Sequence, residues 1–319
     1  MNHYTNDNIF TIDELNPLIQ AATIIGKLDE RVSHEISSES FYFAPIIKDT
    51  AISISSLEGS LVRMESLCRL LGNREATNLD RAVRFSTDIH DAITITRSWD
   101  DAAPSEAQIR EMFTASETSS GRRMTQDLVW SLEEDCQWLR DEMVSLIENP
   151  SAPKAIETIR AIWNSGRFLG NHRRISMLMS GWILARGFSC SSPILGLPIH
   201  ISKDTEGFRD ASNDQKTWLI KVSESLNHIG LEGIGRIENG AASKLSMMTL
   251  CPSEKTSSSV ERAIEYMLKS PVFTARSFAD ALKLTPRGAK VVLDKLEDKN
   301  VVEVDGGSRN RNFVCRRAM

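Results

Sequence analysis

Apolar residues recur every three or four positions through most of this 319-residue chain, and this spacing constrains the fold more than any other feature. A period near 3.6 puts apolar side chains on one face of an α-helix, where they form part of a core. Strand signals are sparse before residue 300, so the sequence predicts a mainly α protein. Predicted apolar faces are Ile12, Leu15, Leu18 and Ile19; Leu57, Leu61, Met64, Leu67 and Leu71; Leu128 to Ile147, ending before Pro150; and Ile156 to Trp163.

The composition is that of an ordinary globular protein, with 41% hydrophobic and 25% charged residues. No run approaches the ~20 apolar residues of a membrane helix, and the first residues are polar, so we expect neither a membrane segment nor a signal peptide. Five widely spaced cysteines without a Cys-x-x-Cys pair predict reduced thiols, no metal site and a cytoplasmic location. We expect no cofactor. The four glycines between Gly230 and Gly240 are interpreted as a turn between helices.

Charge is distributed unevenly along the chain. Residues 253–319 contain 13 Lys and Arg against 9 Asp and Glu, a net charge of +4. The other 252 residues contain 25 Lys and Arg against 34 Asp and Glu, a net charge of −9. An acidic body joined to a basic C-terminal module indicates two separate tasks, of which only the module suits phosphate groups.

The C-terminal module has a characteristic order of predicted elements. An amphipathic helix over 260–268 ends at Ser270-Pro271, and Thr274 can cap a second helix over 275–282. Thr285-Pro286 is a strong start for a third helix. A strand over 301–304, a tight turn at Asp305-Gly306-Gly307 and a returning strand over 312–315 then predict a hairpin.

Three helices followed by a hairpin resemble the winged helix-turn-helix family of DNA-binding domains over about 60 residues. The resemblance implies that the third helix enters the major groove of double-stranded DNA and that the hairpin and tail reach its backbone or minor groove. An alternative stays open: the module makes only protein contacts, which Asp294 on the exposed face of the third helix favours. The candidate DNA-binding residues are Thr285, Arg287, Lys290, Arg309, Arg311, Arg316 and Arg317.

A second candidate site precedes another predicted helix. Gly170-Asn171 followed at once by an apolar helix makes a junction whose free backbone N–H groups could hold an anion. Arg173 and Arg174 stand in the first turn, where cations oppose the helix dipole unless an anion or a carboxylate lies close. A phosphate-like or nucleotide ligand, or pairing with a carboxylate such as Glu58, would satisfy them, and both interpretations stay open.

The same segment resembles the Fic (filamentation induced by cAMP) family, which transfers a nucleotide monophosphate, usually AMP, onto protein hydroxyls. The family loop reads His-Pro-Phe-x-Asp/Glu-Gly-Asn-Gly-Arg-x-x-Arg, and Gly170, Asn171 and Arg173 match it. The resemblance covers about residues 40–230. Further matches, in family order, are Glu58-Gly59 of the inhibitory-helix motif, Gly121-Arg122-Arg123 before the flap, Trp138-Leu139, Pro193-Ile194-Leu195 and Ile199 to Ser202.

Departures from the family motif bear on activity. Ser165 takes the place of the His that serves as general base, and serine is not basic near neutral pH. Leu169 takes the place of the acidic magnesium ligand and cannot coordinate a hard cation. Ser176 takes the place of the last Arg, and His172 replaces the second Gly. With the base and the metal ligand both missing, we expect no catalytic residue and no nucleotide transfer.

The sequence thus predicts a Fic-like helical bundle followed by a small winged helix-turn-helix domain. Expected divisions are an N-terminal helical segment over 1–39, the Fic-like domain over 40–250, a Ser-rich linker over 251–259 and the winged domain over 260–319. We expect a bacterial, sequence-specific DNA-binding regulator, acting as a homodimer, whose inactive Fic-like body serves dimerisation or ligand sensing. The alternatives are a divergent transferase that uses another base and an antitoxin-like interaction module.

Overall fold

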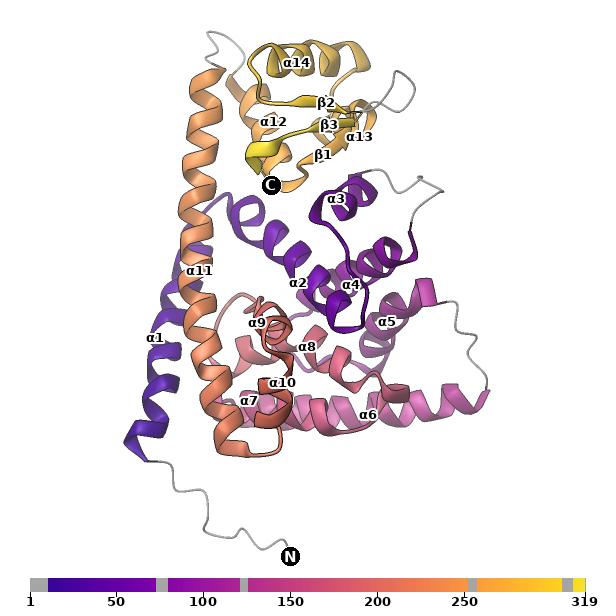
Figure 1. Ribbon diagram of the computed structural model, residues 1–319, viewed down its shortest axis with the longest axis vertical. Helices are drawn as coiled ribbons and strands as arrows, with labels where there is room; N and C mark the ends of the chain where they lie inside the picture. Colours follow the sequence, from indigo (N-terminus) through magenta and orange to yellow (C-terminus); the bar gives the residue numbers. More distant parts are fainter. Residues whose placement is uncertain (1–10, 73–79, 121–125, 252–256, 306–311, 319) are drawn as a thin grey trace, which may run out of the picture. The chain divides into compact units, whose positions relative to one another are not determined.

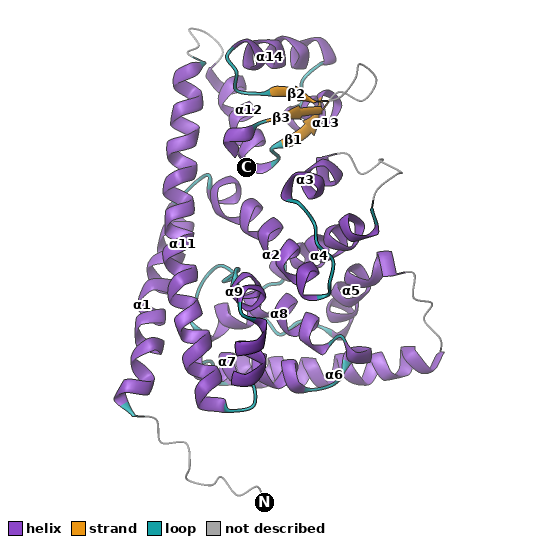
Figure 2. Ribbon diagram, in the orientation of Figure 1, coloured by secondary structure: helices purple, strands orange, loops and turns teal. Residues whose placement is uncertain are grey.

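The computed structural model describes residues 11–72, 80–120, 126–251, 257–305 and 312–318. The chain forms two compact units. The first comprises Met1–Glu30, Ile95–Phe113 and Arg123–Glu232, and the second comprises Arg31–Thr94, Thr114–Arg122 and Gly233–Met319. The described residues are mainly helical with one small sheet near the C-terminus, so the predicted mainly α class with a C-terminal β-wing is confirmed (Figures 1 and 2).

The centre of the first unit is a pair of helices, α7 (Ala152–Asn164) and α8 (His172–Gly187), which pack closely against each other (Figure 1). Ser151 caps α7, its side chain accepting a hydrogen bond from the backbone N–H of Lys154. From Arg174 to Ala185 every residue of α8 is buried, as expected for a helix enclosed on all sides. Around them lie α6 (Gln126–Glu148), η3 (Phe168–Gly170), α9 (Leu197–Lys203), α10 (Thr205–Ala211) and the first parts of α1 (Ile12–His34) and α11 (Gln215–Leu250).

The second unit joins residues 31–94 to the end of α11 and to the C-terminal module. Lys48 on α2 (Ala44–Leu57) is 6% exposed, and its ammonium group donates a 2.6 Å hydrogen bond to the carbonyl of Lys269 at the end of α12 (Ser257–Lys269). Burial lowers the pKa of this amine. The elements of the unit include η1 (Glu39–Phe43), α2 (Ala44–Leu57), α3 (Met64–Gly72), most of α4 (Arg81–Arg97), the end of α5 (Glu106–Glu117), η2 (Thr118–Ser120) and α12 (Ser257–Lys269).

The C-terminal module continues as β1 (Val272–Thr274), α13 (Ala275–Leu282), α14 (Pro286–Asp298), β2 (Glu303–Asp305), β3 (Asn312–Val314) and η4 (Arg316–Ala318). Its strands form an antiparallel sheet in the order β1-β3-β2. Val304 pairs with Phe313 in the hairpin, and Phe273 pairs with Phe313 on the other side. Stacked rings of Phe273, Phe278 and Phe313 build the core beneath it. The three predicted helices are present. The predicted hairpin strands pair with each other, but β2 begins at Glu303 rather than Val301 and includes Asp305, which was expected in the turn. Gly306 and Gly307 of the predicted turn lie outside the described residues, and β1 is an additional strand.

The caps of the module form as its sequence predicts. The Thr274 hydroxyl accepts from the backbone N–H of Ser277 at 3.1 Å, and the Ser277 hydroxyl accepts from that of Thr274 at 3.0 Å, a reciprocal capping box. The Thr285 hydroxyl accepts from the Gly288 N–H at 3.1 Å, with Pro286 in the first turn of α14. These caps fix where both helices begin.

Two predicted apolar faces differ from the structure. The predicted helix through Leu57 and Leu71 is broken, because α2 ends at Leu57, Gly59 takes a φ of +79° and α3 begins only at Met64. A left-handed residue cannot continue a right-handed helix. In α1, Ile12 and Ile19 are 84% and 60% exposed rather than buried. The buried stripe of α1 is Leu18, Ala21, Ile25, Leu28 and Val32.

The predicted turn at Gly230 to Gly240 is also wrong, because these residues lie inside the continuous helix α11. Two of these glycines serve close packing instead. A Cβ on Gly230 would lie 2.9 Å from Ile24, and a Cβ on Gly240 would lie 2.7 Å from the ring of Phe41. The missing side chains let neighbouring segments approach the helix axis.

Within the described ranges, no helix is long and apolar enough to span a membrane. The same residues contain no cluster of three or more His, Cys, Asp or Glu arranged to hold a metal ion.

Candidate functional site

Helix α14 presents a charged face away from the module's core. Ala289, Leu293 and Leu296 are each 1% exposed and anchor the helix. The opposite face is exposed and mixes cations with one apolar and one acidic side chain. It consists of Arg287, Lys290, Val291 and Asp294, with Lys295 at its edge.

The helix before α14 meets it through a tight turn, where Lys283 adopts a φ of +54° and Leu284 donates its backbone N–H to the Ala279 carbonyl at 2.9 Å. Ala279, inside α13, is 6% exposed. Arg262 on α12 donates to the carbonyl of Leu282 and so braces this end of α13. The cation of Arg262 therefore serves the fold, whereas those of Arg287 and Lys290 face outward.

The candidate residues of the wing and tail are only partly described. Arg316 is described, and its guanidinium forms a 2.7 Å ion pair with Glu303 of β2. Hydrogen bonding to this carboxylate raises the pKa of Arg316. Arg309 and Arg311 lie outside the described residues, as does the side chain of Arg317. Arg316 thus already has a carboxylate partner, unlike the exposed pair on α14, for which no ion pair is described.

The junction before α8 has an unusual backbone. Gly166, Phe168, Leu169 and Gly170 have φ values of +68°, +55°, +55° and +86°. Left-handed conformations cost side-chain-bearing residues free energy, so the surrounding structure must hold the loop in place. Gly170 ends η3 and Asn171 precedes α8, whose first turn contains Arg173 and Arg174.

Asp135 on α6 is the residue that holds this loop. Asp135 is 5% exposed, and its carboxylate accepts a 2.6 Å hydrogen bond from the Phe168 N–H and a 3.0 Å hydrogen bond from the Arg167 guanidinium. Arg167 also lies over the Trp138 ring, with its guanidinium carbon 4.8 Å from the ring centroid. Neither Asp135 nor Arg167 is among the residues predicted from the sequence. A signal was present, since Asp135 interrupts the apolar face that Leu132 and Leu139 share.

Structural hydrogen bonds occupy the positions where the Fic loop has catalytic groups. The Ser165 hydroxyl donates a 2.9 Å hydrogen bond to the Ile162 carbonyl and closes the end of α7. Ser176 is fully buried and donates a 2.8 Å hydrogen bond to the Ile159 carbonyl, which ties α8 to α7. Leu169 is a turn residue in the left-handed conformation. The two hydroxyls are thus used as helix contacts.

The two arginines of the junction differ in environment. Arg173 is exposed and lies over Trp163, with its guanidinium carbon 5.3 Å from the ring centroid. Arg174 is 3% exposed and belongs to the interior of the unit. Between the loop and these residues, His172 has its pKa lowered by burial first and by the Arg173 cation second. An anion approaching this junction from solvent would therefore meet Arg173 rather than Arg174.

The residues of the inhibitory-type motif lie at the end of α2. Glu58 is exposed, and its backbone N–H bonds back to the helix through the Ile54 carbonyl at 3.3 Å. Gly59 follows with its left-handed φ. The predicted Gly121-Arg122-Arg123 element lies outside the described residues.

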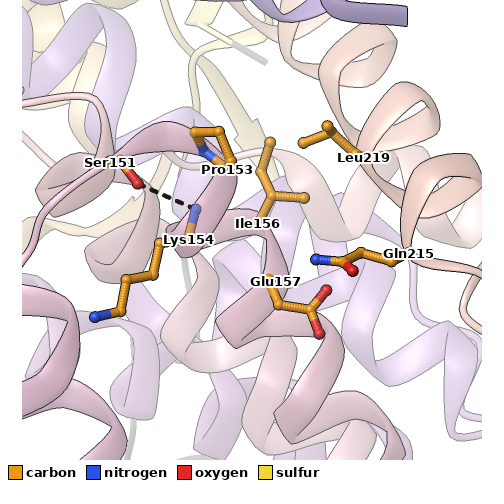
Figure 3. A pocket seen from close by; sticks show the side chains of 7 residues that line it. All are labelled: Ser151, Pro153, Lys154, Ile156, Glu157, Gln215 and Leu219. Carbon is orange, nitrogen blue, oxygen red and sulfur yellow. Dashed lines mark hydrogen bonds between the residues drawn. The ribbon is translucent and has the colours of Figure 1, made fainter. Parts of the chain in front are cut away.

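A pocket of about 320 Å³ lies between the start of α7 and the start of α11 (Figure 3). Its lining includes Glu157 and Gln215, whose polar groups are drawn close to each other in Figure 3. Glu157 is already paired with Arg160 at 2.6 Å. Lys154 also lines the pocket, and its ammonium group donates to the Ser145 carbonyl, so both charged side chains of the lining already have partners. The complete lining is Ser151, Pro153, Lys154, Ile156, Glu157, Gln215 and Leu219.

The arrangement of the chain is similar to that of a solved structure, a Fic family protein from Desulfovibrio desulfuricans G20 determined at 2.70 Å resolution. The superposition has a TM-score of 0.54 at 10% sequence identity and covers 98% of each chain. No protein-family model matches the sequence. No curated protein matches it significantly. Likeness at this identity establishes the fold alone: the chain has a Fic-like fold.

Proposed function

We propose that the protein is a sequence-specific DNA-binding regulator whose C-terminal module binds double-stranded DNA through α14. The observation that carries this proposal is the exposed face of α14, which presents Arg287 in the first turn and Lys290 one turn later. In a winged helix-turn-helix, side chains near the start of the third helix lie against base edges. An arginine there can bind guanine through two hydrogen bonds.

The charge distribution supports the same assignment. Residues 253–319 carry a net charge of +4, whereas the remainder of the chain carries −9. A duplex is attracted to the module and repelled by the acidic body, which orients the encounter. We further propose that the protein binds as a homodimer, because two half-sites read together compensate for the small area that one module buries.

In this proposal the Fic-like body is not catalytic. Ser165 and Ser176 are engaged in helix contacts, and Leu169 supplies neither a base nor a metal ligand. The body would instead serve dimerisation or sensing of a small anionic ligand at the Gly170–Arg174 junction. Incubating the protein with labelled ATP and magnesium tests this: self-labelling that Arg173→Ala abolishes would show that the body is a transferase.

The DNA-binding proposal is tested by selecting duplexes from a random pool and measuring their affinity by fluorescence anisotropy at several salt concentrations. Arg287→Ala should cost about 1–3 kcal/mol on the selected duplex and relax preference at one base pair. Lys290→Ala should weaken binding to every duplex and reduce the salt slope by about one.

Two results of these binding measurements would contradict the proposal. Failure of the wild type to bind any duplex at low salt would refute the proposal and leave protein contacts as the module's role. Binding that Arg287→Ala leaves equally strong and equally selective would show that α14 does not read the sequence.

A further inference from the structure

We propose that Arg69 of α3 is a positioning residue for the wing hairpin, so that the DNA-binding apparatus extends into residues 64–72. This inference rests on the proposed function. It concerns a helix nearly 190 residues before the module along the chain, outside the winged domain that the sequence delimits.

Helix α3 covers the sheet of the module on the side away from its aromatic core. Cys68 and Met64 pack against Val272 of β1 and Val314 of β3, which are 1% and 2% exposed. Gly72 at the end of α3 lies so close to β1 that a Cβ there would fall 2.3 Å from the Val272 carbonyl oxygen. The sheet is therefore packed on both faces, one of them by α3.

Arg69 extends this packing to the base of the wing. Its guanidinium pairs with Glu65 one turn earlier at 2.8 Å and also with Asp305. Asp305 is the last residue of β2 and pairs with Asn312 in the register, so it stands where the hairpin loop begins. Hydrogen bonding to Arg69 lowers the pKa of Glu65, and the pKa of Arg69 is raised. Arg69 thus holds one end of β2 through the carboxylate of Asp305. Its second pair, with Glu65, helps to orient the guanidinium toward Asp305.

The opposite end of β2 is held in the same way. Glu303, its first residue, pairs with Arg316 beyond β3 at 2.7 Å. Strands of three residues form a weak hairpin by themselves. Two ion pairs, one at each end of β2, therefore hold this strand of the hairpin, one to α3 and one to the residue that follows Cys315.

The exposure of Arg69 and Asp305 to solvent limits how much DNA affinity their ion pair can contribute. The side chains of Arg69 and Asp305 are 42% and 40% exposed, so solvent screens their pair and the fold does not depend on it. Removing the pair should leave the protein folded but the wing less fixed. We expect a two- to fivefold loss of DNA affinity rather than its abolition.

The direction in which two substitutions change DNA affinity tests the proposal. DNA affinity is measured on a duplex selected from a random pool, with Arg69→Gln and Asp305→Asn prepared singly and together. If Arg69 positions the wing, both variants weaken binding two- to fivefold and the double variant is no weaker than either. If Arg69 acts only through its charge, Arg69→Gln weakens binding while Asp305→Asn strengthens it, because a negative group near phosphates has been removed. That result would overturn the proposal.

Two further measurements complete the test. Arg63→Gln removes an equal charge from the exposed segment just before α3 and should change affinity less than Arg69→Gln. Amide hydrogen exchange without DNA should be faster in β2 and β3 of Arg69→Gln than in the wild type, and unchanged exchange would refute the positioning role. Because exchange is measured without DNA, it distinguishes failure of this inference from failure of DNA binding itself.

Discussion

Asp135 shows how a single buried carboxylate can hold an energetically unfavourable loop. It neutralises Arg167 and accepts from the Phe168 N–H, next to two side-chain-bearing residues with positive φ. Asp135→Ala would leave this N–H without its acceptor in a buried place. We expect a loss of about 2 kcal/mol in the free energy of unfolding, measured with urea. Asp135→Asn, which keeps an acceptor oxygen, should lose less, and equal losses would contradict this role.

Val291 is the apolar member of the exposed α14 face, one turn after Arg287, and is 50% exposed. The apolar group that bases present in the major groove is the thymine methyl. If α14 lies in that groove, replacing one thymine of the selected duplex by uracil should weaken wild-type binding by about two- to fivefold. Val291→Ala, which keeps only one methyl group, should show a smaller preference for thymine than the wild type. Asp294→Ala serves as the control, because it should raise affinity for both duplexes and keep the preference for thymine.

His200 on α9 predicts a pH dependence of stability. Its ring stacks on that of His228, with centroids 6.0 Å apart. Burial lowers the pKa of His200 most; Glu232 opposes the shift, and Lys203 and His228 add to it. With its folded pKa below the unfolded value near 6.5, His200 contributes stability that is present above this pH and is lost as the pH falls.

The test compares wild type and His200→Asn by urea unfolding between pH 7.5 and pH 5. The free energy of unfolding should fall more steeply for the wild type over this interval, and the two should run parallel from pH 7.5 to 8.5. Parallel curves over the whole range would contradict the prediction.

At the scale of elements, substitutions of the glycines in α11 test whether this segment is a helix or a turn. Gly235 lies in the helix with open space around the position of a Cβ, whereas a Cβ on Gly240 would lie 2.7 Å from Phe41. Gly235→Ala should therefore stabilise the protein by about 0.5–1 kcal/mol through helix propensity. Gly240→Ala should destabilise it by about 1–3 kcal/mol through overpacking. Thermal and urea unfolding measure both, and destabilisation by Gly235→Ala would indicate that this stretch is not regular helix.

Elements were predictable from sequence where a local signal decided them. Thr274 and Thr285 with its following proline fixed two helix starts correctly. The broken helix at Gly59 and the uninterrupted helix through Gly240 were misread, because a glycine permits both a left-handed turn and a close packing contact. Which of these occurs depends on a neighbour distant in sequence, such as Phe41. The strand β1 was missed because three residues carry too little periodicity to identify it.

At the scale of the whole molecule, the sequence predicts a linker over 251–259 and a separate winged domain, and a truncation tests this. The module packs on α3 through Val272 and Val314, and Lys48 donates to the end of α12. A fragment of residues 1–251 should therefore expose Cys68 and Met64, bind a hydrophobic dye and lose about 2–3 kcal/mol of stability. A fragment as stable as the full chain, without dye binding, would show that the module is an independent tethered domain.

The candidate sites were predictable in part. Residue types and order along the chain located α14 and the Gly170–Arg174 junction, because both depend on contiguous residues. Asp135, which holds the junction, comes from another helix and could not be assigned by spacing alone. The same is true of Arg69, which contacts β2 through Asp305. Which of Arg173 and Arg174 meets solvent was likewise decided by packing, since adjacent helical residues point in different directions.

The hydroxyl of Ser176 has a consequence for engineering. It sits in a fully enclosed position and joins α8 to the Ile159 carbonyl. Restoring the family's arginine there would place a guanidinium among apolar side chains and leave that carbonyl without its donor. A designer who wished to revive transferase chemistry would thus have to rebuild the contact between the two central helices first, because changing the loop alone would unsettle the scaffold that carries it.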